Sequence, residues 1–394
     1  MKTFVLLVTM TSFVLTTKSY RGKLNAVTTT DTMFEMSQDT NFVILVLDSL
    51  DSKTLSEVIQ NEERYRDVFK DFTYYPNTVG MYPYTTYALP HILTGICYQN
   101  DETFDDYNIR AYQSSELLNN LEKKGYNINV FMDPDIVPKY GENIFDFDNS
   151  HNEFKIGSWF EFAKIQVKLV GLRYAPYQIK YKCMILTEWI DELMVTEGDS
   201  EIYLDNNAIF YQSLAAEDIT YIDEPCFKYI HLEGAHLPFR YDENMNVLEE
   251  TSYTQCVKAS VTVADAYLDK LREAGVYDNS VIIVMADHGY SEEQVLYNAF
   301  GRQNPILFVK GVRESHDLEI SQAPISFDDL QEAYKRLLDG KPSAEVFDAR
   351  ENEERIRRYI YYYYGDEEHM YEYMLEGHAF DDVMTPTGES YTYE

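Results

Sequence analysis

Short apolar runs recur along the chain and alternate with polar or amphipathic stretches. Residues 41–48 read NFVILVLD, an unbroken apolar run that ends in an acid. Such a run is typical of a strand buried on both faces of a parallel sheet. Directly after it, the spacing of apolar residues between Ser52 and Tyr65 predicts an amphipathic helix with one buried side.

The same alternation continues to about residue 340. Further strands are predicted at residues 126–132, 227–232, 280–286 and 305–309, and further helices at 114–124, 253–274 and 328–338. A glycine follows each of these helices closely, and glycine often ends a helix because it adopts the left-handed conformation. Alternating strands and helices predict an α/β fold with a mostly parallel central sheet flanked by helices.

The N-terminal end differs from this middle part. Residues 3–17 (TFVLLVTMTSFVLTT) carry no charge, but the run is shorter than the about 20 apolar residues that a membrane-spanning helix needs. We expect residues 1–17 to be a membrane anchor or signal segment and residues 18–40 to be a linker. This places the following domain at the cell membrane, on the extracytoplasmic side. A buried strand or helix of the domain is less favoured because the polar linker isolates the run.

Two further regions stand apart. Residues 154–182 hold six basic residues and one acid among many aromatic and aliphatic residues. A basic, aromatic, amphipathic stretch of this kind binds a membrane interface, and a core-packing helical insertion with solvated lysines is the equal alternative. Residues 341–394 form a tyrosine-rich extension that includes RRYIYYYYGDEEHMYEYM. Alternating strand residues and an aromatic cover over the domain edge both explain this composition.

Charge and cysteine content restrict the partners. The formal net charge of −34 should repel nucleic acid. An anionic substrate would therefore need a cation in the site, and a metal ion is the natural candidate. The cysteines, Cys97, Cys183, Cys226 and Cys256, are widely spaced and match no zinc or redox pattern, so we expect buried free thiols rather than disulfides.

Polar residues follow three of the predicted strands. Asp48 ends the first run, His231 and His236 belong to the segment FKYIHLEGAH, and the pair Asp287 and His288 follows SVIIVMA. Because sites in open α/β sheets lie outside the carboxyl ends of the strands, these side chains can converge there. Two carboxylates and an imidazole suit Zn²⁺ or Mn²⁺, with Mg²⁺ or Ca²⁺ also open, and leave one position for another oxygen.

The stretch TTYALPHILTG at residues 85–95 supplies a hydroxyl for that position. Thr85 and Thr86 stand side by side at its start. A threonine oxygen beside a divalent metal is activated as a nucleophile without a separate base, and the same metal binds a phosphoryl or sulfuryl oxygen. Each of these polar residues alone has an ordinary alternative, such as a helix cap, a polar turn or a loop histidine. Their conjunction at several strand ends favours a catalytic site.

Four segments resemble, in this order, the sulfatase-like branch of the alkaline phosphatase superfamily: NFVILVLDSLD, TTYALPHILTG, HLEGAHLP and SVIIVMADHG. The resemblance covers about residues 41–340 and is nearest to membrane-anchored phosphotransferases, such as lipoteichoic acid synthases and phosphoethanolamine transferases. It implies an alkaline-phosphatase-like catalytic domain over these residues. It also implies that Asp48, Asp287 and His288 are ligands of one divalent metal ion.

The resemblance also selects the nucleophile, which would be a further metal ligand. In sulfatases of this branch, the modified Cys or Ser lies nine residues before the Thr of a Thr-Gly. In phosphoethanolamine transferases, the nucleophilic Thr lies five residues before a Pro. Counting back from Thr94 and from Pro90 gives Thr85 in both cases, and Thr86 is the alternate.

Two further roles and two departures follow from the resemblance. His236 is similar to the histidine that contacts the transferred group or protonates the leaving oxygen, and Arg302 is placed to hold an anionic oxygen of the substrate. Formylglycine sulfatases need Cys or Ser followed by x-Pro-x-Arg, whereas the block from Thr85 has neither Pro nor Arg in place. Two-zinc phosphodiesterases need extra ligands, and His316 lacks a family-like context, so one metal ion is expected.

Together these residues predict a membrane-tethered, metal-dependent phosphotransferase. It would move a head group from a phospholipid or other anionic phosphodiester to a hydroxyl acceptor through a phospho-threonine at Thr85, with His236 as general acid. A sulfatase-like hydrolase of phosphodiesters, phosphonates or sulfate esters that uses the same residues is the enzymatic alternative. An inactive binding domain with this fold is the non-enzymatic alternative.

Overall fold

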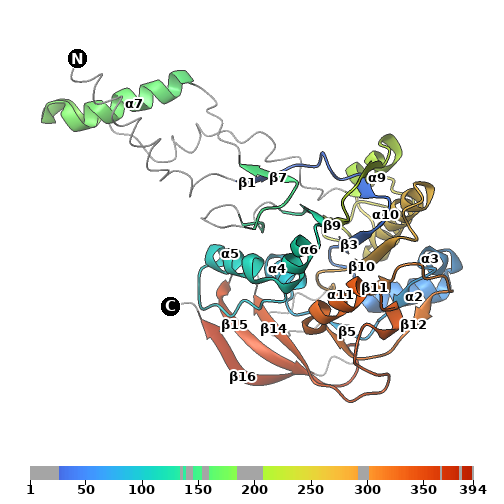
Figure 1. The fold of residues 1–394 in the computed structure, drawn as a ribbon. Coiled ribbons are helices and arrows are strands. Elements are labelled where there is room, and N and C mark those ends of the chain that lie inside the picture. Colours follow the sequence, from blue (N-terminus) through green and yellow to red (C-terminus); the bar gives the residue numbers. More distant parts are fainter. Residues whose placement is uncertain are drawn as a thin grey trace.

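The computed structural model describes residues 26–133, 136–138, 145–152, 159–183, 207–291, 301–363, 366–380 and 384–392. Within these residues, a seven-stranded sheet forms the centre of the molecule, and helices cover both of its faces (Figure 1). The predicted anchor or signal segment, residues 1–17, lies outside the described residues.

The central sheet confirms the predicted α/β class. Its strands are β3 (Asn41–Leu47), β4 (Thr73–Tyr74), β6 (Asn127–Phe131), β9 (Cys226–Leu232), β10 (Ser280–Met285), β11 (Leu307–Lys310) and β12 (Glu319–Ile320). They are arranged in the order β12-β4-β11-β10-β3-β9-β6. The neighbours β10, β3, β9 and β6 run parallel, whereas β11 runs antiparallel to both β10 and β4. The parallel part brings the carboxyl ends of β10, β3 and β9 to the same edge.

Side chains of β3 alternate between two core layers, one on each face of the sheet. The even-numbered residues from 42 to 46 pack with α4, α5, α6 and α11, and the odd-numbered residues from 43 to 47 pack with α2, α3, α9 and α10. Every residue of β3 is buried, which for each large aliphatic side chain stabilises the fold by about 1.5–3 kcal/mol. The helices are α2 (Ser52–Asn61), α3 (Glu63–Val68), α4 (Thr85–Thr94), α5 (Phe104–Ser114), α6 (Glu116–Lys123), α9 (Asn207–Ala216), α10 (Tyr253–Glu273) and α11 (Leu330–Leu338).

The boundaries of the predicted strands and helices agree with the structure to within a few residues. The helix predicted at residues 114–124 is the second of two consecutive helices that meet at Ser115. The Ser115 hydroxyl accepts a hydrogen bond from the backbone N–H of Leu118 at 3.2 Å and so caps the start of α6. Before α11, the chain makes a short 3₁₀ turn, η3 (Phe327–Asp329), where the sequence pattern predicts α-helix.

Small pairs of strands and single turns complete the body of the molecule. The pairs are β1 (Ala26–Thr28) with β7 (Ser150–Asn152), β2 (Glu35–Ser37) with β8 (Thr220–Ile222), and β5 (Thr78–Val79) with β13 (Ile325–Ser326). Two other 3₁₀ turns are η2 (Tyr177–Cys183) and η4 (Ser343–Glu345). All four cysteines are free as predicted, but only Cys226 and Cys256 are buried, whereas Cys97 and Cys183 are partly exposed.

Helix α7 (Trp159–Tyr174) belongs to the basic stretch and lies apart from the helices that cover the sheet (Figure 1). Phe160 and Val167 are 72% and 71% exposed, so these two side chains do not pack into the core. Among the described helices, none is both long and apolar enough to cross a membrane.

The tyrosine-rich extension forms an antiparallel sheet of strands β14 (Arg357–Tyr363), β15 (Asp366–Leu375) and β16 (Met384–Thr392). Alternate side chains of β14 have different environments. Ile360 and Tyr362 pack with Tyr82, Tyr87 and Tyr98 beside α4, whereas the intervening tyrosines form a separate cluster. Strand alternation and an aromatic cover, the two explanations for this composition, therefore both apply.

Candidate active site

The parallel strands bring three of the predicted metal ligands together at one sheet edge. Asp48 follows β3, and Asp287 and His288 follow β10, which pairs in register with β3. One ligand atom from each residue lies within 4.8 Å of the others, and all three residues are buried. His288 Nε2 is 3.5 Å from Asp48 Oδ1 and 3.5 Å from Asp287 Oδ2. We refer to these three residues as the strand-end cluster.

Hydrogen bonds fix how the cluster presents its donor atoms. His288 Nδ1 faces the carbonyl oxygen of Gly289 at 2.8 Å, and a carbonyl only accepts, so Nδ1 carries the proton and Nε2 faces the carboxylates. Asp287 Oδ1 accepts from the backbone N–H groups of Ser49 at 3.2 Å and His288 at 2.9 Å. Asp287 Oδ2 is buried without a hydrogen-bond partner.

This donor set fits a divalent metal ion. A buried carboxylate oxygen without a partner is costly, and a cation between the carboxylates and His288 would satisfy Asp287 Oδ2. Two carboxylates and one neutral imidazole leave positions for further ligands, as in catalytic metal sites. The geometry therefore supports a metal site at the position that the sequence predicts.

Thr85 is the first residue of α4 and lies at this cluster. Its Oγ1 donates to Asp48 Oδ2 over 3.2 Å, and the residue is partly exposed. Thr86 is exposed, and within the described residues no hydrogen bond joins its hydroxyl to the strand-end cluster. The N-terminus of α4 also carries the positive end of the helix dipole and unpaired N–H groups, which favour an anion beside Thr85. Of the two threonines, Thr85 is therefore the one that lies at the strand-end cluster.

His231 of β9, which the sequence pattern places near a strand end without giving it a role, also lies at this cluster. Its Nε2 lies 3.6 Å from Asp48 Oδ2, and the residue is 5% exposed. In the strand register, His231 pairs with Val46 of β3, two residues before Asp48. The sequence shows a polar residue near the end of a predicted strand. Its contact with Asp48 can be predicted only once β9 is known to lie beside β3.

Histidines control the ionisation of Asp48. Burial alone would raise the pKa of Asp48, but the imidazole of His231 3.6 Å away and the nearby imidazoles of His288 and His236 hold this pKa well below its ordinary value. Asp48 therefore remains a carboxylate, the form that binds a metal ion, to low pH.

His236 and Arg302 lie at the border of the site. His236 is exposed, its Nδ1 lies 2.6 Å from the carbonyl oxygen of Leu237, and its charge acts on Asp48. Arg302 donates to the carbonyl oxygen of Pro83 over 3.3 Å, and its guanidinium carbon lies 4.7 Å from the centre of the Tyr84 ring. Arg302 therefore sits against the two residues that precede Thr85.

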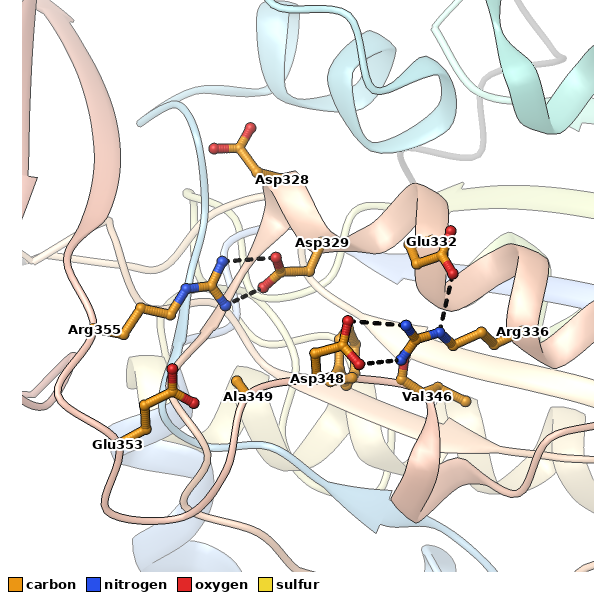
Figure 2. Close-up of a pocket in the computed structure, with 10 residues that line it drawn as sticks. Asp328, Asp329, Glu332, Arg336, Val346, Asp348, Ala349, Glu353 and Arg355 are labelled. Atoms are coloured by element: carbon orange, nitrogen blue, oxygen red, sulfur yellow. Dashed lines mark hydrogen bonds and ion pairs between the residues drawn. The ribbon is translucent and has the colours of Figure 1, made fainter.

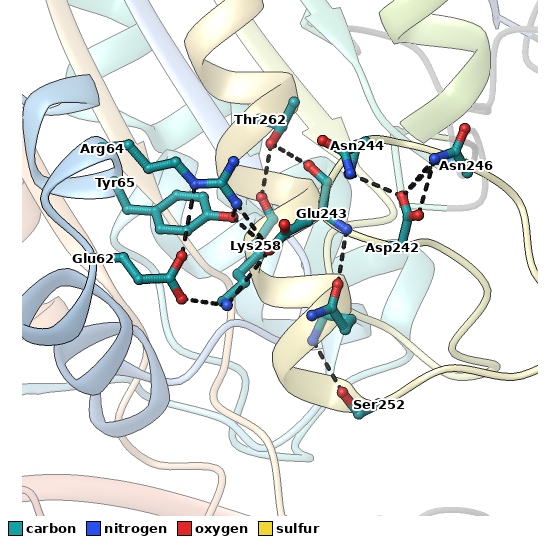
Figure 3. A network of polar contacts seen from close by, with 11 residues as sticks. Glu62, Arg64, Tyr65, Asp242, Glu243, Asn244, Asn246, Ser252, Lys258 and Thr262 are labelled. Carbon is teal, nitrogen blue, oxygen red and sulfur yellow. Dashed lines mark hydrogen bonds and ion pairs between the residues drawn. The ribbon is translucent and has the colours of Figure 1, made fainter.

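The segment after β9 carries His236 and is anchored to α10 by polar contacts (Figure 3). The Thr262 hydroxyl donates to the carbonyl oxygen of Glu243 over 2.8 Å. The Glu243 carboxylate pairs with Arg64 Nη2 at 2.8 Å and with Lys258 Nζ at 3.5 Å. These contacts hold the far end of the segment that carries His236.

Gly234 allows the same segment to pass directly against Asp48. It has φ +60°, and a Cβ atom there would lie 2.2 Å from the backbone oxygen of Asp48 and 2.4 Å from its nitrogen. Asn207 holds both polar groups of Gly234, because its side chain donates to the carbonyl at 2.7 Å and accepts from the N–H at 3.0 Å. Nearby, Asp51 rather than Asp48 caps a helix, because Asp51 Oδ1 accepts from the N–H of Thr54 at 2.8 Å.

The chain matches a family sequence model and is similar to several solved structures. A sequence model described as "Sulfatase" matches residues 40–332. Among solved structures, a protein in the alkaline phosphatase superfamily from Vibrio parahaemolyticus is 14% identical, with a TM-score of 0.52 over 93% of this chain and 85% of that chain. Ps i-CgsB is 14% identical, with a TM-score of 0.50 over 86% and 82%.

A more distant structural likeness is to the lipoteichoic acid synthase LtaP from Listeria monocytogenes. It is 12% identical, with a TM-score of 0.45 over 89% of this chain and 85% of that chain. None of the curated proteins matches the sequence significantly. At these identities, the two structures with TM-scores of 0.52 and 0.50 establish a shared fold and leave the reaction to be argued from the residues themselves.

Proposed function

The chain belongs to the sulfatase family of the alkaline phosphatase superfamily, and we propose that it is a metal-dependent phosphotransferase. The donor would be a phospholipid or related phosphodiester, and the acceptor would be a hydroxyl group. The observation that carries this proposal is the hydrogen bond between Thr85 Oγ1 and Asp48 Oδ2, because it places a threonine hydroxyl at the strand-end cluster. Family membership itself supports an enzyme, either a hydrolase or a transferase.

Metal binding would fall to Asp48, Asp287 and His288. A bound divalent cation supplies Lewis-acid chemistry that stabilises the charge on the transferred group. The preference of two carboxylates and an imidazole for Zn²⁺ or Mn²⁺ is the basis for naming these ions. Local positive charge is also what an anionic ester needs in a protein with a formal net charge of −34.

The proposed reaction has two steps, in which Thr85 is the nucleophile and His236 moves the protons. Thr85 Oγ1 releases its proton to solvent and, as the alkoxide, attacks the donor phosphorus. The bond from phosphorus to the leaving alcohol breaks, and His236 gives that alcohol a proton. The acceptor hydroxyl then loses its proton to His236 and attacks the phospho-threonine, and the bond from phosphorus to Thr85 Oγ1 breaks, which restores the alkoxide. The N-terminus of α4 and the guanidinium of Arg302 support the anionic oxygens of the transferred group.

The nucleophile argues against a formylglycine sulfatase. Such enzymes need Cys or Ser at this position, followed by Pro and Arg at fixed spacing. Here the corresponding block is Thr85-Thr-Tyr-Ala-Leu, which starts α4 directly. A hydroxyl nucleophile without this motif is consistent with a phospho-threonine route and supports phosphate rather than sulfate transfer.

Trapping the covalent intermediate tests the proposal. The purified chain would be loaded with Zn²⁺ or Mn²⁺, mixed with vesicles that contain phosphatidylethanolamine or phosphatidylglycerol, and quenched in acid without an acceptor. Peptide mass analysis should find the head-group phosphate on Thr85. The matched pair of variants is Thr85→Ala, which should give no adduct, and Thr86→Ala, which should still give it. An adduct on Thr86, or turnover without any adduct, would overturn the assignment.

Hydrolysis is the second candidate, and the exposure of His236 favours it. Because His236 lies at the solvent side of the site, water can take the place of the acceptor hydroxyl in the second step. Phosphorus NMR of the products, with and without added glycerol, separates the two reactions. A glycerol-dependent product would support transfer, and a free phosphate monoester that is unchanged by glycerol would support hydrolysis.

We also propose that the chain works at the extracytoplasmic face of the cell membrane, with helix α7 as a contact. The exposed apolar side chains of α7, including Phe160 and Val167, lie among basic residues such as Lys164 and Arg173. This local composition is opposite to the net charge of the chain and complementary to an anionic lipid surface.

Vesicle flotation tests this contact. Charge reversal at Lys164, Lys168 and Arg173 should reduce binding to vesicles that contain phosphatidylglycerol. The matched control is charge reversal at the exposed Lys123 and Lys124 at the end of α6, which should leave binding unchanged. Equal binding of both variants would return the basic stretch to an ordinary solvated surface.

A further inference from the structure

A second group of metal-ligating side chains lies at the other end of α4. His91 is in the last part of α4, Cys97 is in the chain that follows it, and Asp328 is in η3. One ligand atom from each of these three residues lies within 4.8 Å of the others. We propose that His91, Cys97 and Asp328 form a second metal site, suited to Zn²⁺ and separate from the strand-end cluster.

The state of His91 is the first observation behind this proposal. The residue is 1% exposed, and neither of its ring nitrogens makes a hydrogen bond. Nε2 lies 3.4 Å from Asp328 Oδ1, and the ring meets Tyr82 edge to face at 5.9 Å between ring centres. A buried imidazole without a hydrogen bond is costly, and a metal ion on Nε2 would relieve that cost.

The position of Asp328 is the second observation. Its neighbour Asp329 is held by Arg355, with two hydrogen bonds of 2.6 and 2.7 Å, whereas Asp328 takes no part in that pair and points away from it (Figure 2). Asp328 also lines a pocket of about 330 Å³, and its side chain is 38% exposed. The carboxylate is therefore available as a ligand, and its partial exposure leaves it accessible to an ion.

The charges around the cluster also suit a dication. Arg358 Nη2 lies 3.0 Å from Cys97 Sγ and 3.6 Å from Asp328 Oδ1, and Arg358 Nη1 lies 3.7 Å from Glu372 Oε2. When Cys97 is ionised, three anions face one guanidinium, so a divalent cation completes the neutralisation. Arg358 would also donate a hydrogen bond to the ligating sulfur of Cys97, and such bonds to metal ligands are common around bound metals.

The donor atoms of the second cluster indicate which ion it binds, and they differ from those of the strand-end cluster. Sulfur, nitrogen and oxygen donors together favour Zn²⁺ among the common divalent ions, whereas the strand-end cluster contains no thiol. A metal at the second site would connect α4 and the following chain to η3, with Arg358 of β14 as its outer contact. This inference concerns binding and stability, and it does not depend on the reaction at Thr85.

Cobalt binding to the full chain tests the proposal. Metal is removed with a chelator, Co²⁺ is added, and the near-ultraviolet charge-transfer absorption that requires a thiolate ligand is recorded. The expected result is this absorption in the wild type and its loss, with about one bound ion fewer per chain, in Cys97→Ser. Two controls should keep the absorption: Cys183→Ser, which removes the other partly exposed thiol, and Asp48→Asn, which impairs the strand-end cluster.

A protection measurement on the unmodified chain keeps the test independent of folding in the variants. Co²⁺ or Zn²⁺ should slow alkylation of Cys97 by iodoacetamide and leave alkylation of Cys183 unchanged. Absence of the absorption, its persistence in Cys97→Ser, or alkylation of Cys97 that is unaffected by metal would overturn the proposal. The last outcome would indicate a Cys97 thiolate paired with His91 and Arg358 and no metal site.

Discussion

Helix α4 connects two clusters that the chain builds in different ways. At its first residue, Thr85 bonds to Asp48 of the strand-end cluster, and near its last turn His91 faces Cys97 and Asp328. The sheet assembles the first cluster, because the carboxyl ends of parallel strands meet at one edge. A helix, an irregular segment and a 3₁₀ turn assemble the second, and no strand register brings them together. Ligand residues at the ends of parallel strands can therefore be predicted from the sequence. Ligand residues that irregular segments bring together cannot.

The clusters also differ in how completely their polar atoms are satisfied. In the first, His288 has its Nδ1 bonded to the carbonyl of Gly289, so the ring is oriented before any metal binds. In the second, neither ring nitrogen of His91 has such a bond. Hydrogen bonding therefore orients the histidine of the first cluster in advance. In the second cluster, a bound metal ion would have to orient the His91 ring.

The largest effect is expected at the catalytic end of α4. Thr85→Ala should lower turnover of a phosphodiester by at least about a thousandfold, because loss of a nucleophile removes the covalent route. Metal content should stay unchanged, because Asp48, Asp287 and His288 remain. Steady-state kinetics with metal analysis would check this, and Thr86→Ala is the matched control. A Thr85→Ala variant with nearly full turnover would refute the assigned nucleophile.

The next effect concerns stability at the other end of α4. In an Asp48→Asn background, Zn²⁺ at a hundred times its dissociation constant should still stabilise the fold by about 2.7 kcal/mol, because the second cluster remains intact. Adding Cys97→Ser to this background should abolish the stabilisation, whereas adding Cys183→Ser should not. Thermal unfolding with and without zinc provides the measurement. Equal zinc effects in both double variants would argue against the second site.

A smaller effect is expected for His231, the strand residue to which the sequence assigns no role. His231→Gln should lower turnover by about 10- to 100-fold, the usual cost of losing an outer partner of a metal ligand. In the metal-free chain His231 helps to hold the pKa of Asp48 low, so its loss should raise this pKa and weaken metal binding as the pH falls. A metal affinity at acidic pH that matches the wild type would show that His231 is only a packing residue.

The smallest effect is a pH dependence of stability in the metal-free chain. Burial lowers the pKa of His91, but attraction by Asp328 and Cys97 outweighs burial and raises it from 6.5 to about 9. Protonated His91 therefore stabilises the fold fully below about pH 6.5, and this contribution is lost as the pH rises through about 9. The difference in unfolding free energy between wild type and His91→Phe should shrink over that range, and a constant difference would contradict the assignment.

Much of the fold and part of the site could be predicted from the chain itself. The run NFVILVLD predicts β3, and β10 follows from the same reasoning, because a strand buried on both faces requires consecutive apolar residues. Asp48, Asp287 and His288 then follow as the first polar residues after those strands, and spacing within the family motif selects Thr85. The structure brings all four together.

The remaining features depend on tertiary neighbours that one sequence does not specify. His231 reads as an ordinary strand residue until β9 is placed beside β3, and only then does it face Asp48. Cys97 matches no local pattern because its partners come from α4 and from η3, more than 200 residues later. The exposure of α7 likewise follows from its position outside the helical layers rather than from its composition.

The close contact of Gly234 with Asp48 limits which positions of this enzyme can be mutated in a library. Any side chain at that position must displace the peptide that carries Asp48, since its first carbon would overlap the backbone of Asp48. In a saturation library, position 234 should therefore score like a catalytic position, although it contributes no atom to the reaction. A directed-evolution campaign for new donors would gain more from the exposed positions 237 and 238 of the same segment, where side chains can change without moving the aspartate or the proposed general acid.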